Sequence, residues 1–301
     1  MPITEHARQR RRNYVGSSDA AAILGRDPYG RTRQDIYYEK TAELAENGTT
    51  AAMDTGNRLE SPLLDFASER IGLPIRKNQF RVADNGIQAS NLDAIVIGAN
   101  EGVEGKVTSI IDDWGDDGTD AVNTYTALQC QHHMAVSGFD AIWVPLLYVH
   151  FRVEWRLYKV PRSQEIIDIL TEHELKFWKE HVEPRIPPSL EPPSMGILKR
   201  LIREPASTID LDDEALVAWE AREVQRKALK VEEDAYEQAT ARVLNLLGNN
   251  EVGKCPDGRL LCYIEENAGE RLIDSKQAKA LHPDLFQPST RRVLRLKKGP
   301  K

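Results

Sequence analysis

The chain contains little cysteine. Its 301 residues include three, Cys130, Cys255 and Cys262, and these are scattered. An odd and dispersed set does not provide a disulfide framework, so we expect a reduced, cytoplasmic protein. Three cysteines at these spacings also fall short of the four thiolates that hold an iron–sulfur cluster, and we expect no such cluster.

Long hydrophobic runs are missing as well. No apolar stretch approaches the roughly 20 residues that a membrane helix needs, and we expect no membrane contact. The N-terminus is rich in arginine but lacks the apolar segment of a secretory signal behind it. Hydrophobic residues make up 41% and charged residues 29% of the chain, a balance typical of globular proteins.

Basic residues are fewer than acidic ones, with 40 Lys and Arg against 47 Asp and Glu. The resulting net charge of −7 at pH 7 argues at first against a polyanionic partner such as nucleic acid. The charge is segregated, however: arginines cluster in residues 8–12, residues 291–301 contain no acid, and residues 210–237 hold much of the acidic excess. Because phosphate contacts are made by local patches, the net charge does not exclude nucleic acid. The alternative is that both basic ends are solvated tails.

The order of the expected elements predicts the fold class. Apolar spacing predicts helices and β-prone runs predict strands, in an order that indicates an α/β fold with a central mixed sheet flanked by helices. The expected helices cover 17–46 (interrupted at 28–30), 56–71, 120–137 and 162–183, and the expected strands are two or three within 74–107, then 141–149 and 151–160.

Proline marks a division of the chain. Five prolines stand within residues 183–194, so we expect a semi-extended linker at 186–195 between a domain of residues 1–185 and an appendage of residues 196–301. In the appendage the sequence predicts a long helix over 210–247 and a small hairpin over 251–266. The pattern leaves open whether the long helix packs on the core or contacts an oligomer or other partner.

A set of acids around one lysine carries the strongest chemical signal. Asp93 lies near the start of the apolar run 91–98, a turn is expected at 99–102, and Glu104, Gly105 and Lys106 follow. Since alternate residues of a strand face the same side, Glu104 and Lys106 project together. Two carboxylates suit a divalent metal and an ammonium can orient a water, the parts needed to cut a phosphodiester. The alternative is a solvated hairpin with a surface ion pair.

Four motifs follow one another along the chain. They are Tyr14-Val-Gly-Ser-Ser-Asp-Ala-Ala-Ala-Ile-Leu-Gly25 with Asp27-Pro28-Tyr29, Thr55-Gly-Asn-Arg-Leu-Glu60, Asn91-Leu-Asp93 with Glu104-Gly-Lys106, and Tyr125-Thr-Ala-Leu-Gln-Cys-Gln131 with Val136-Ser-Gly138. In this order they resemble the YqaJ-type phage recombinase family, relatives of phage lambda exonuclease. The resemblance covers roughly residues 10–185 and implies a restriction-endonuclease-like core of the PD-(D/E)xK nuclease superfamily.

The sequence departs from that family at two points. Gly105 replaces the usual apolar residue between the glutamate and the lysine, although its carbonyl can still serve as a metal ligand. Tyr125 lies four residues before Gln129 rather than three, a spacing that keeps both on one helix face.

The residues and the resemblance together predict a Mg²⁺ site, with Mn²⁺ as a substitute. Asp93 and Glu104 are the expected direct ligands, and the Gly105 carbonyl is a third. Glu60 is expected to complete the shell directly or through water; the alternative is an acid that only favours its helix N-terminus.

Two further residues complete the expected catalytic set. Lys106 is expected to orient the attacking water or to meet the scissile phosphate. The resemblance implies that Gln129 positions the water or Lys106, the alternative being an ordinary surface amide. The adjacent His132 and His133 point in different directions on a helix, so we expect helix-surface or packing roles rather than metal ligation.

Ser18 with Arg11 or Arg12 is a candidate pocket for a terminal phosphate. A hydroxyl, a helix N-terminus and a guanidinium together bind an anion well, and in the lambda-type relatives such a pocket holds the 5′ phosphate. The alternative is that Ser18 is only a helix N-cap.

These observations predict a Mg²⁺-dependent 5′→3′ exonuclease acting on linear double-stranded DNA ends. It would leave 3′ single strands for a phage-type single-strand annealing protein, and the resemblance implies a homo-oligomer, a ring-shaped trimer. The alternatives are a structure-specific DNA endonuclease of the same superfamily and a catalytically inactive DNA-binding or assembly protein.

Overall fold

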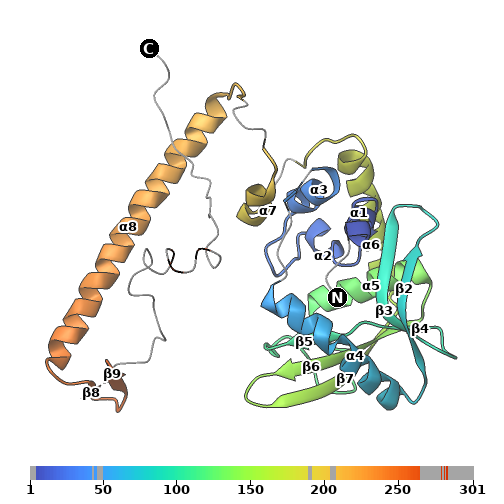
Figure 1. Cartoon of the computed structure of the whole chain (residues 1–301), viewed down its shortest axis with the longest axis horizontal. Coiled ribbons are helices and arrows are strands. Elements are labelled where there is room, and N and C mark those ends of the chain that lie inside the picture. The colour runs from blue at the N-terminus through green and yellow to red at the C-terminus, as the bar shows by residue number, and fades with distance from the viewer. Residues whose placement is uncertain are drawn as a thin grey trace. The chain divides into compact units, whose positions relative to one another are not determined.

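The computed structural model of the chain describes residues 5–42, 44–45, 50–188, 192–203 and 208–264 and the single positions 279, 281 and 283 (Figure 1). The chain divides into two compact units, Met1–Ser207 and Thr208–Lys301. Among the described residues no helix combines the length and the apolarity needed to cross a membrane.

Unit 1 is built on one mixed sheet, as the sequence predicts. Its strands are β1 (Val15–Gly16), β2 (Ile75–Val82), β3 (Gln88–Val96), β4 (Glu101–Val103), β5 (Lys106–Thr108), β6 (Ala141–Val149) and β7 (Val153–Pro161). They follow the order β1-β3-β4-β6-β5, with β2 beside β3 and β7 beside β6. The pairs β2–β3, β3–β4 and β6–β7 are antiparallel, whereas β1–β3, β4–β6 and β5–β6 are parallel.

Helices cover both faces of this sheet (Figure 1). The described helices of unit 1 are α1 (Glu5–Arg12), α2 (Ala20–Ile23), α3 (Arg33–Thr41), α4 (Ala51–Ile71), α5 (Thr124–Ser137), α6 (Gln164–Phe177), which continues into a π-helical turn (Trp178–Val182), and α7 (Met195–Arg200). One buried cluster packs α5 and α6 on β3, β6 and β7, through residues such as Met134, Ile142 and Ile167. A second packs α4 on β3, β4 and β7 through Leu64 and Val103. The predicted fold class, a mixed sheet flanked by helices, is confirmed.

Capping residues explain where the main helices start and stop. The Asn123 side chain accepts a hydrogen bond from the backbone of Thr126 and opens α5. Gly72 and Gly138 end α4 and α5 with φ of 76° and 71°, the left-handed conformation that glycine adopts without strain. Both stops agree with the prediction.

Several predicted boundaries differ in the structure, among them the following three. Helix α2 begins only after Asp19, so Ser18 is not its N-cap. Helix α4 starts at residue 51 rather than 56, because Thr50 caps it. Strand β7 starts at residue 153, and its expected apolar face is buried only from Leu157 on, since Phe151 and Val153 at the hairpin tip are 95% and 59% exposed.

The proline-rich segment does not divide the two units. Helix α7 beyond it belongs to unit 1, because the backbone of Ala45 bonds to Arg200 at 2.7 Å and Ser194 N donates to Asp35 Oδ1 at 2.8 Å. These contacts place the boundary at residues 207/208 instead of within 186–195.

Unit 2 contains the predicted long helix and hairpin. Helix α8 (Asp213–Leu247) is capped by the Asp212 side chain, and β8 (Val252–Lys254) pairs antiparallel with β9 (Leu260–Cys262). Much of the apolar surface of α8 is open: Leu216, Val224 and Val231 are 53%, 63% and 65% exposed.

Candidate active site

Strand register brings the two predicted metal-binding acids together. Ala94 of β3 faces Val103 of β4 in the antiparallel pair, so the next facing positions are Asp93 and Glu104. Side chains that face each other across a strand pair have Cβ atoms about 5 Å apart. The Gly105 N–H donates to Asp93 Oδ2 at 2.8 Å and ties the two segments together.

The backbone changes strand at the site itself. The sequence predicts one strand through residues 103–107, but β4 ends at Val103 and β5 begins at Lys106, and both pair parallel with β6. Glu104 N still donates to Trp143 O at 2.9 Å. The preceding turn also lies earlier than expected, because Gly102 is already in β4, where an added Cβ would meet Ile142 Cδ1 at 2.7 Å.

Lys106 is held between an acid and an amide. Its Nζ donates to Glu104 Oε1 at 2.8 Å and to Gln129 Oε1 at 2.7 Å. Gln129, on α5, is 5% exposed, which excludes the alternative of a surface amide. Burial alone would lower the pKa of Lys106, but the charge of Glu104 and its hydrogen bond raise the pKa above its ordinary value. The side chain is therefore an ammonium at neutral pH.

Glu104 is buried but held in its ionised form. Burial would raise its pKa, yet the charge of Lys106 and the nearby His133 outweigh burial and lower the pKa to about 2. His133 Nδ1 lies 2.6 Å from Ser90 Oγ. His133 Nε2 lies 3.3 Å from Glu104 Oε2 but makes no hydrogen bond within the described part of the chain.

Asp93 has the opposite electrostatic environment. Burial and, next, the charge of Glu104 raise its pKa well above the ordinary value, and Glu60 adds to this effect. The hydrogen bond from Gly105 and the charge of Lys106 offset only part of the increase. The site thus confines two carboxylates that repel one another.

Such a site fits a hard divalent cation. Carboxylate oxygens are the ligands that Mg²⁺ and Mn²⁺ prefer, and a cation would offset the repulsion between Asp93 and Glu104. Within the described ranges no three His, Cys, Asp or Glu side chains are grouped so as to hold a metal. Mg²⁺ is compatible with this, because it usually keeps several waters and needs only one or two protein carboxylates.

Glu60 lies in the interior of a helix. It is the tenth residue of α4, which begins at Ala51, so the alternative of an N-terminal helix acid does not hold. Its charge contributes to the raised pKa of Asp93, and Glu60 is therefore an electrostatic neighbour of the acid pair.

A basic residue outside the predicted phosphate pocket contacts Ser18. Arg12 Nη2 donates to Ala42 O at 2.6 Å, and Lys40 Nζ donates to the Arg11 carbonyl at 2.8 Å. The guanidinium that contacts Ser18 is that of Arg31, through the Ser18 carbonyl. No sequence motif marks Arg31, although it closely follows Asp27-Pro28-Tyr29.

Of the two adjacent histidines, His132 has the predicted packing role, whereas His133 faces the Glu104 carboxylate. His132 is fully buried, with Nδ1 2.9 Å from Glu174 Oε1 and Nε2 3.0 Å from Ala89 O. Gln88 Nε2 donates to Glu174 Oε2 at 2.5 Å. This network fixes α5 and α6 on β3 behind the acid pair.

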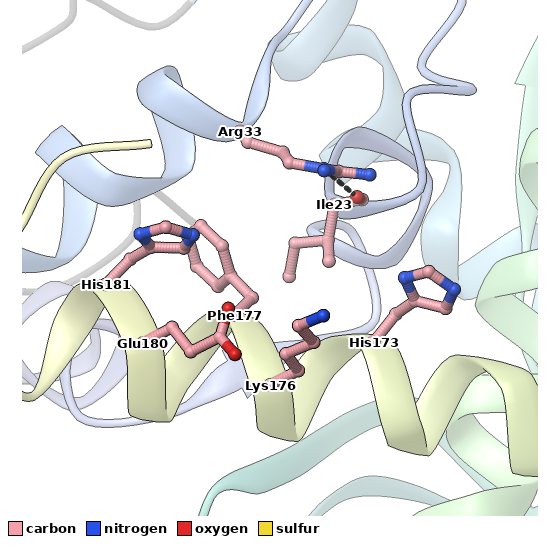
Figure 2. Close-up of a pocket in the computed structure, with 7 residues that line it drawn as sticks. All are labelled: Ile23, Arg33, His173, Lys176, Phe177, Glu180 and His181. Carbon is pink, nitrogen blue, oxygen red and sulfur yellow. Dashed lines mark hydrogen bonds between the residues drawn. The ribbon is translucent and has the colours of Figure 1, made fainter. Parts of the chain in front are cut away.

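A separate hollow lies between α2, α3 and α6 (Figure 2). None of the predicted site residues lines it, so it is distinct from the acid cluster. In Figure 2 the Arg33 guanidinium donates to the Ile23 carbonyl, at 2.6 Å, opposite the side chains of α6 and its π-helical turn. The lining residues are Ile23, Arg33, His173, Lys176, Phe177, Glu180 and His181.

The fold and the site agree with the core that the resemblance implies. Helices flank a mixed sheet, and Asp93, Glu104 and Lys106 lie on successive segments of it. Residues 8–140 match the family model of the YqaJ-like viral recombinase domain. Over these residues the chain is similar to that domain, in agreement with the resemblance that the motifs indicate.

Similar proteins extend the comparison beyond that domain. The chain is 25% identical over 289 residues to YqaJ of Bacillus subtilis (strain 168), a protein described as uncharacterized. The alignment covers 92% of this chain and 88% of the relative. An alkaline exonuclease from Laribacter hongkongensis is similar at a TM-score of 0.49 and 16% identity, over 61% of this chain and 94% of its own. A phage-related exonuclease from Haemophilus somnus 129PT has a TM-score of 0.43 and 14% identity, over 55% and 92% respectively.

Proposed function

We propose that the protein is a metal-dependent deoxyribonuclease that digests linear double-stranded DNA from its ends in the 5′→3′ direction. The observation that carries this proposal is the acid pair of Asp93 and Glu104 on facing strand segments, with Lys106 fixed beside it. The YqaJ-like viral recombinase domain supports a nuclease function. A 3′ single strand would remain as product and would serve a phage-type single-strand annealing protein.

Asp93 and Glu104 would hold Mg²⁺, or Mn²⁺ in its place, with the Gly105 carbonyl as an additional ligand. Glu60 would complete the shell directly or through water. When bound, the metal would supply an activated water and neutralise charge that develops on the phosphate.

Lys106 contributes charge and orientation rather than proton abstraction. The raised pKa of Lys106 favours its protonated form, which suits charge stabilisation better than proton abstraction. An ammonium has three N–H donors, and two are used by Glu104 and Gln129. The third remains for a water or a phosphate oxygen, and the two fixed bonds aim it before substrate binds. Gln129 thus positions Lys106, and preorganised donors of this kind stabilise developing negative charge.

The terminal phosphate would bind beside Ser18, with Arg31 and the arginines Arg11 and Arg12 supplying positive charge. Such a pocket would favour ends that carry a 5′ phosphate. We further propose a cytoplasmic homo-oligomer, a trimer by resemblance to the family, which light scattering of the purified protein would measure directly.

The decisive experiment compares linear and covalently closed circular duplex DNA incubated with protein and Mg²⁺. Digestion of the linear DNA alone supports the exonuclease, whereas cutting of closed circles indicates an endonuclease of the same superfamily. If neither is degraded while gel-shift binding persists, the protein is a DNA-binding or assembly factor. Glu104→Ala is the matched inactive control, and we expect its activity to fall at least about 10³-fold, because a lost metal ligand removes several kcal/mol of transition-state stabilisation.

A further inference from the structure

One exposed aromatic side chain near the acid cluster has no role in the chemistry described so far. The ring of Tyr29 is 76% exposed, and its edge meets the ring of Tyr125 with centroids 5.4 Å apart at an interplanar angle of 84°. Large aromatic side chains stabilise a fold mainly through their buried surface. The exposed ring of Tyr29 contributes little in this way. An exposed ring that is nevertheless held in place suits a ligand with an apolar, flat face.

The turn that carries Tyr29 is fixed by a buried carboxylate. Asp27 accepts the Tyr29 N–H at 2.8 Å through Oδ1 and the Arg31 Nε–H at 3.0 Å through Oδ2, and its side chain has no exposed surface. Gly30 closes the turn with φ of 72°. The ring is therefore presented on a preorganised support, which reduces the entropy that a binding partner must overcome.

The Tyr29–Tyr125 pair lies beside the proposed reaction centre. Tyr125 precedes Gln129 by four residues on α5, about one helical turn of 5.4 Å, and Gln129 bonds Lys106. Burial raises the pKa of the Tyr125 phenol, while the charges of Arg31 and Lys106 partly lower it, so both cations act on this ring. Tyr125 therefore lies within the electrostatic reach of both Arg31 and Lys106.

We propose that Tyr29, supported by Tyr125, is a stacking platform for an unpaired nucleobase at the DNA end. Arg31 and Lys106 would hold phosphates on either side of the nucleotide whose base stacks on the Tyr29 ring. Stacking on an aromatic side chain tolerates every base, because each base has a π-face, which suits an enzyme that digests DNA of any sequence. Holding the terminal base unpaired would also keep the end open for the next step. The inference rests on the proposed function and names the part of the substrate that this site recognises.

The test measures binding without cleavage. Wild-type protein, in EDTA, is titrated with a short duplex that carries 2-aminopurine in a frayed 5′-phosphorylated end, and the fluorescence of the probe reports stacking. Tyr29→Phe retains the ring and is expected to bind and quench like wild type. Tyr29→Leu keeps apolar bulk but removes the ring, and we expect about tenfold weaker binding and loss of quenching. Phe151→Leu, at a 95% exposed position on the β6–β7 tip, is the matched control and should change neither.

Two outcomes overturn the platform: no quenching with wild-type protein, or equal binding and quenching by wild type and Tyr29→Leu. Thermal unfolding of Tyr29→Leu and Tyr29→Phe side by side shows that both fold, since an exposed ring contributes little to stability. Digestion of linear DNA by wild type is assayed separately. If digestion fails while the Tyr29 effects persist, the proposed exonuclease activity is wrong and the stacking platform stands. If digestion proceeds and Tyr29→Leu binds like wild type, the stacking platform is wrong and the exonuclease activity stands.

Discussion

Replacing Asp93 by asparagine separates stability from function at the acid pair. The pKa of Asp93 is raised because the carboxylate is buried and faces Glu104. In the metal-free protein, the contribution of Asp93 to stability is fully present at pH values below its unfolded-state pKa of about 3.9. This contribution is lost as the pH rises through the raised pKa of Asp93 in the folded state. Asparagine removes the repelling charge, and its amide oxygen can still accept the Gly105 N–H. The variant should therefore lose this pH dependence.

The size of the effect follows from linkage. Each pKa unit corresponds to about 1.4 kcal/mol, so in EDTA at pH 8 Asp93→Asn should be more stable than wild type by at least about 1 kcal/mol. For a domain of this size that corresponds to a Tm higher by about 2–4 °C. The advantage should shrink as the pH falls toward about 4 and should vanish below it, where Asp93 is protonated in both the folded and the unfolded state.

Bound metal is expected to favour the stability of wild type over that of Asp93→Asn. A cation that binds only the folded state stabilises by an amount that grows with its concentration over Kd, so Mn²⁺ should raise the Tm of wild type and leave that of Asp93→Asn unchanged. Activity on linear DNA should fall at least about 10³-fold.

Calorimetry in EDTA and in Mn²⁺, at pH 5 and pH 8, measures these stability effects. The matched control is Asp117→Asn, because Asp117 is bound by Arg70 and the Leu157 N–H and its pKa is lowered. This control should be slightly less stable than wild type and fully active. An Asp93→Asn variant that is less stable than wild type in EDTA at pH 8, or that keeps the Mn²⁺ shift, refutes the reasoning.

Two further perturbations follow from the contacts. Arg31→Ala should reduce the preference for 5′-phosphorylated over 5′-hydroxyl ends by about tenfold in digestion kinetics, because it removes the guanidinium that contacts Ser18; an unchanged ratio would exclude Arg31 from the pocket. Glu174→Ala should lower the free energy of unfolding, measured in urea, by about 3–5 kcal/mol, since it leaves His132 buried without its carboxylate partner. The control Glu172→Ala, at an exposed position, should stay within about 0.5 kcal/mol of wild type. Equal losses in the two variants would contradict the hydrogen-bond network.

Local signals in the sequence predicted much of the fold. Glycine at positions 72 and 138 marked the helix ends, and the apolar run of residues 141–149 coincides with β6. These elements are specified by neighbouring residues, so a sequence pattern suffices. The pairing of Asp93 with Glu104 was also accessible, because a short hairpin sets its register locally.

Long-range contacts account for what the sequence did not predict. Arg31 is paired with Ser18 because the buried Asp27 turns the intervening loop back, which no periodicity reveals. The break at Gly105 follows from the parallel pairing of both β4 and β5 with β6, whose residues lie far along the chain. The burial of Gln129 depends in the same way on how α5 packs on the sheet.

The central claim is that Asp93 and Glu104 bind one divalent cation beside Lys106. Crystals of the protein with bound DNA, soaked in Mn²⁺, test it most directly through anomalous scattering. The account predicts a manganese peak between the Asp93 and Glu104 carboxylates. Bound DNA with no such peak would contradict it.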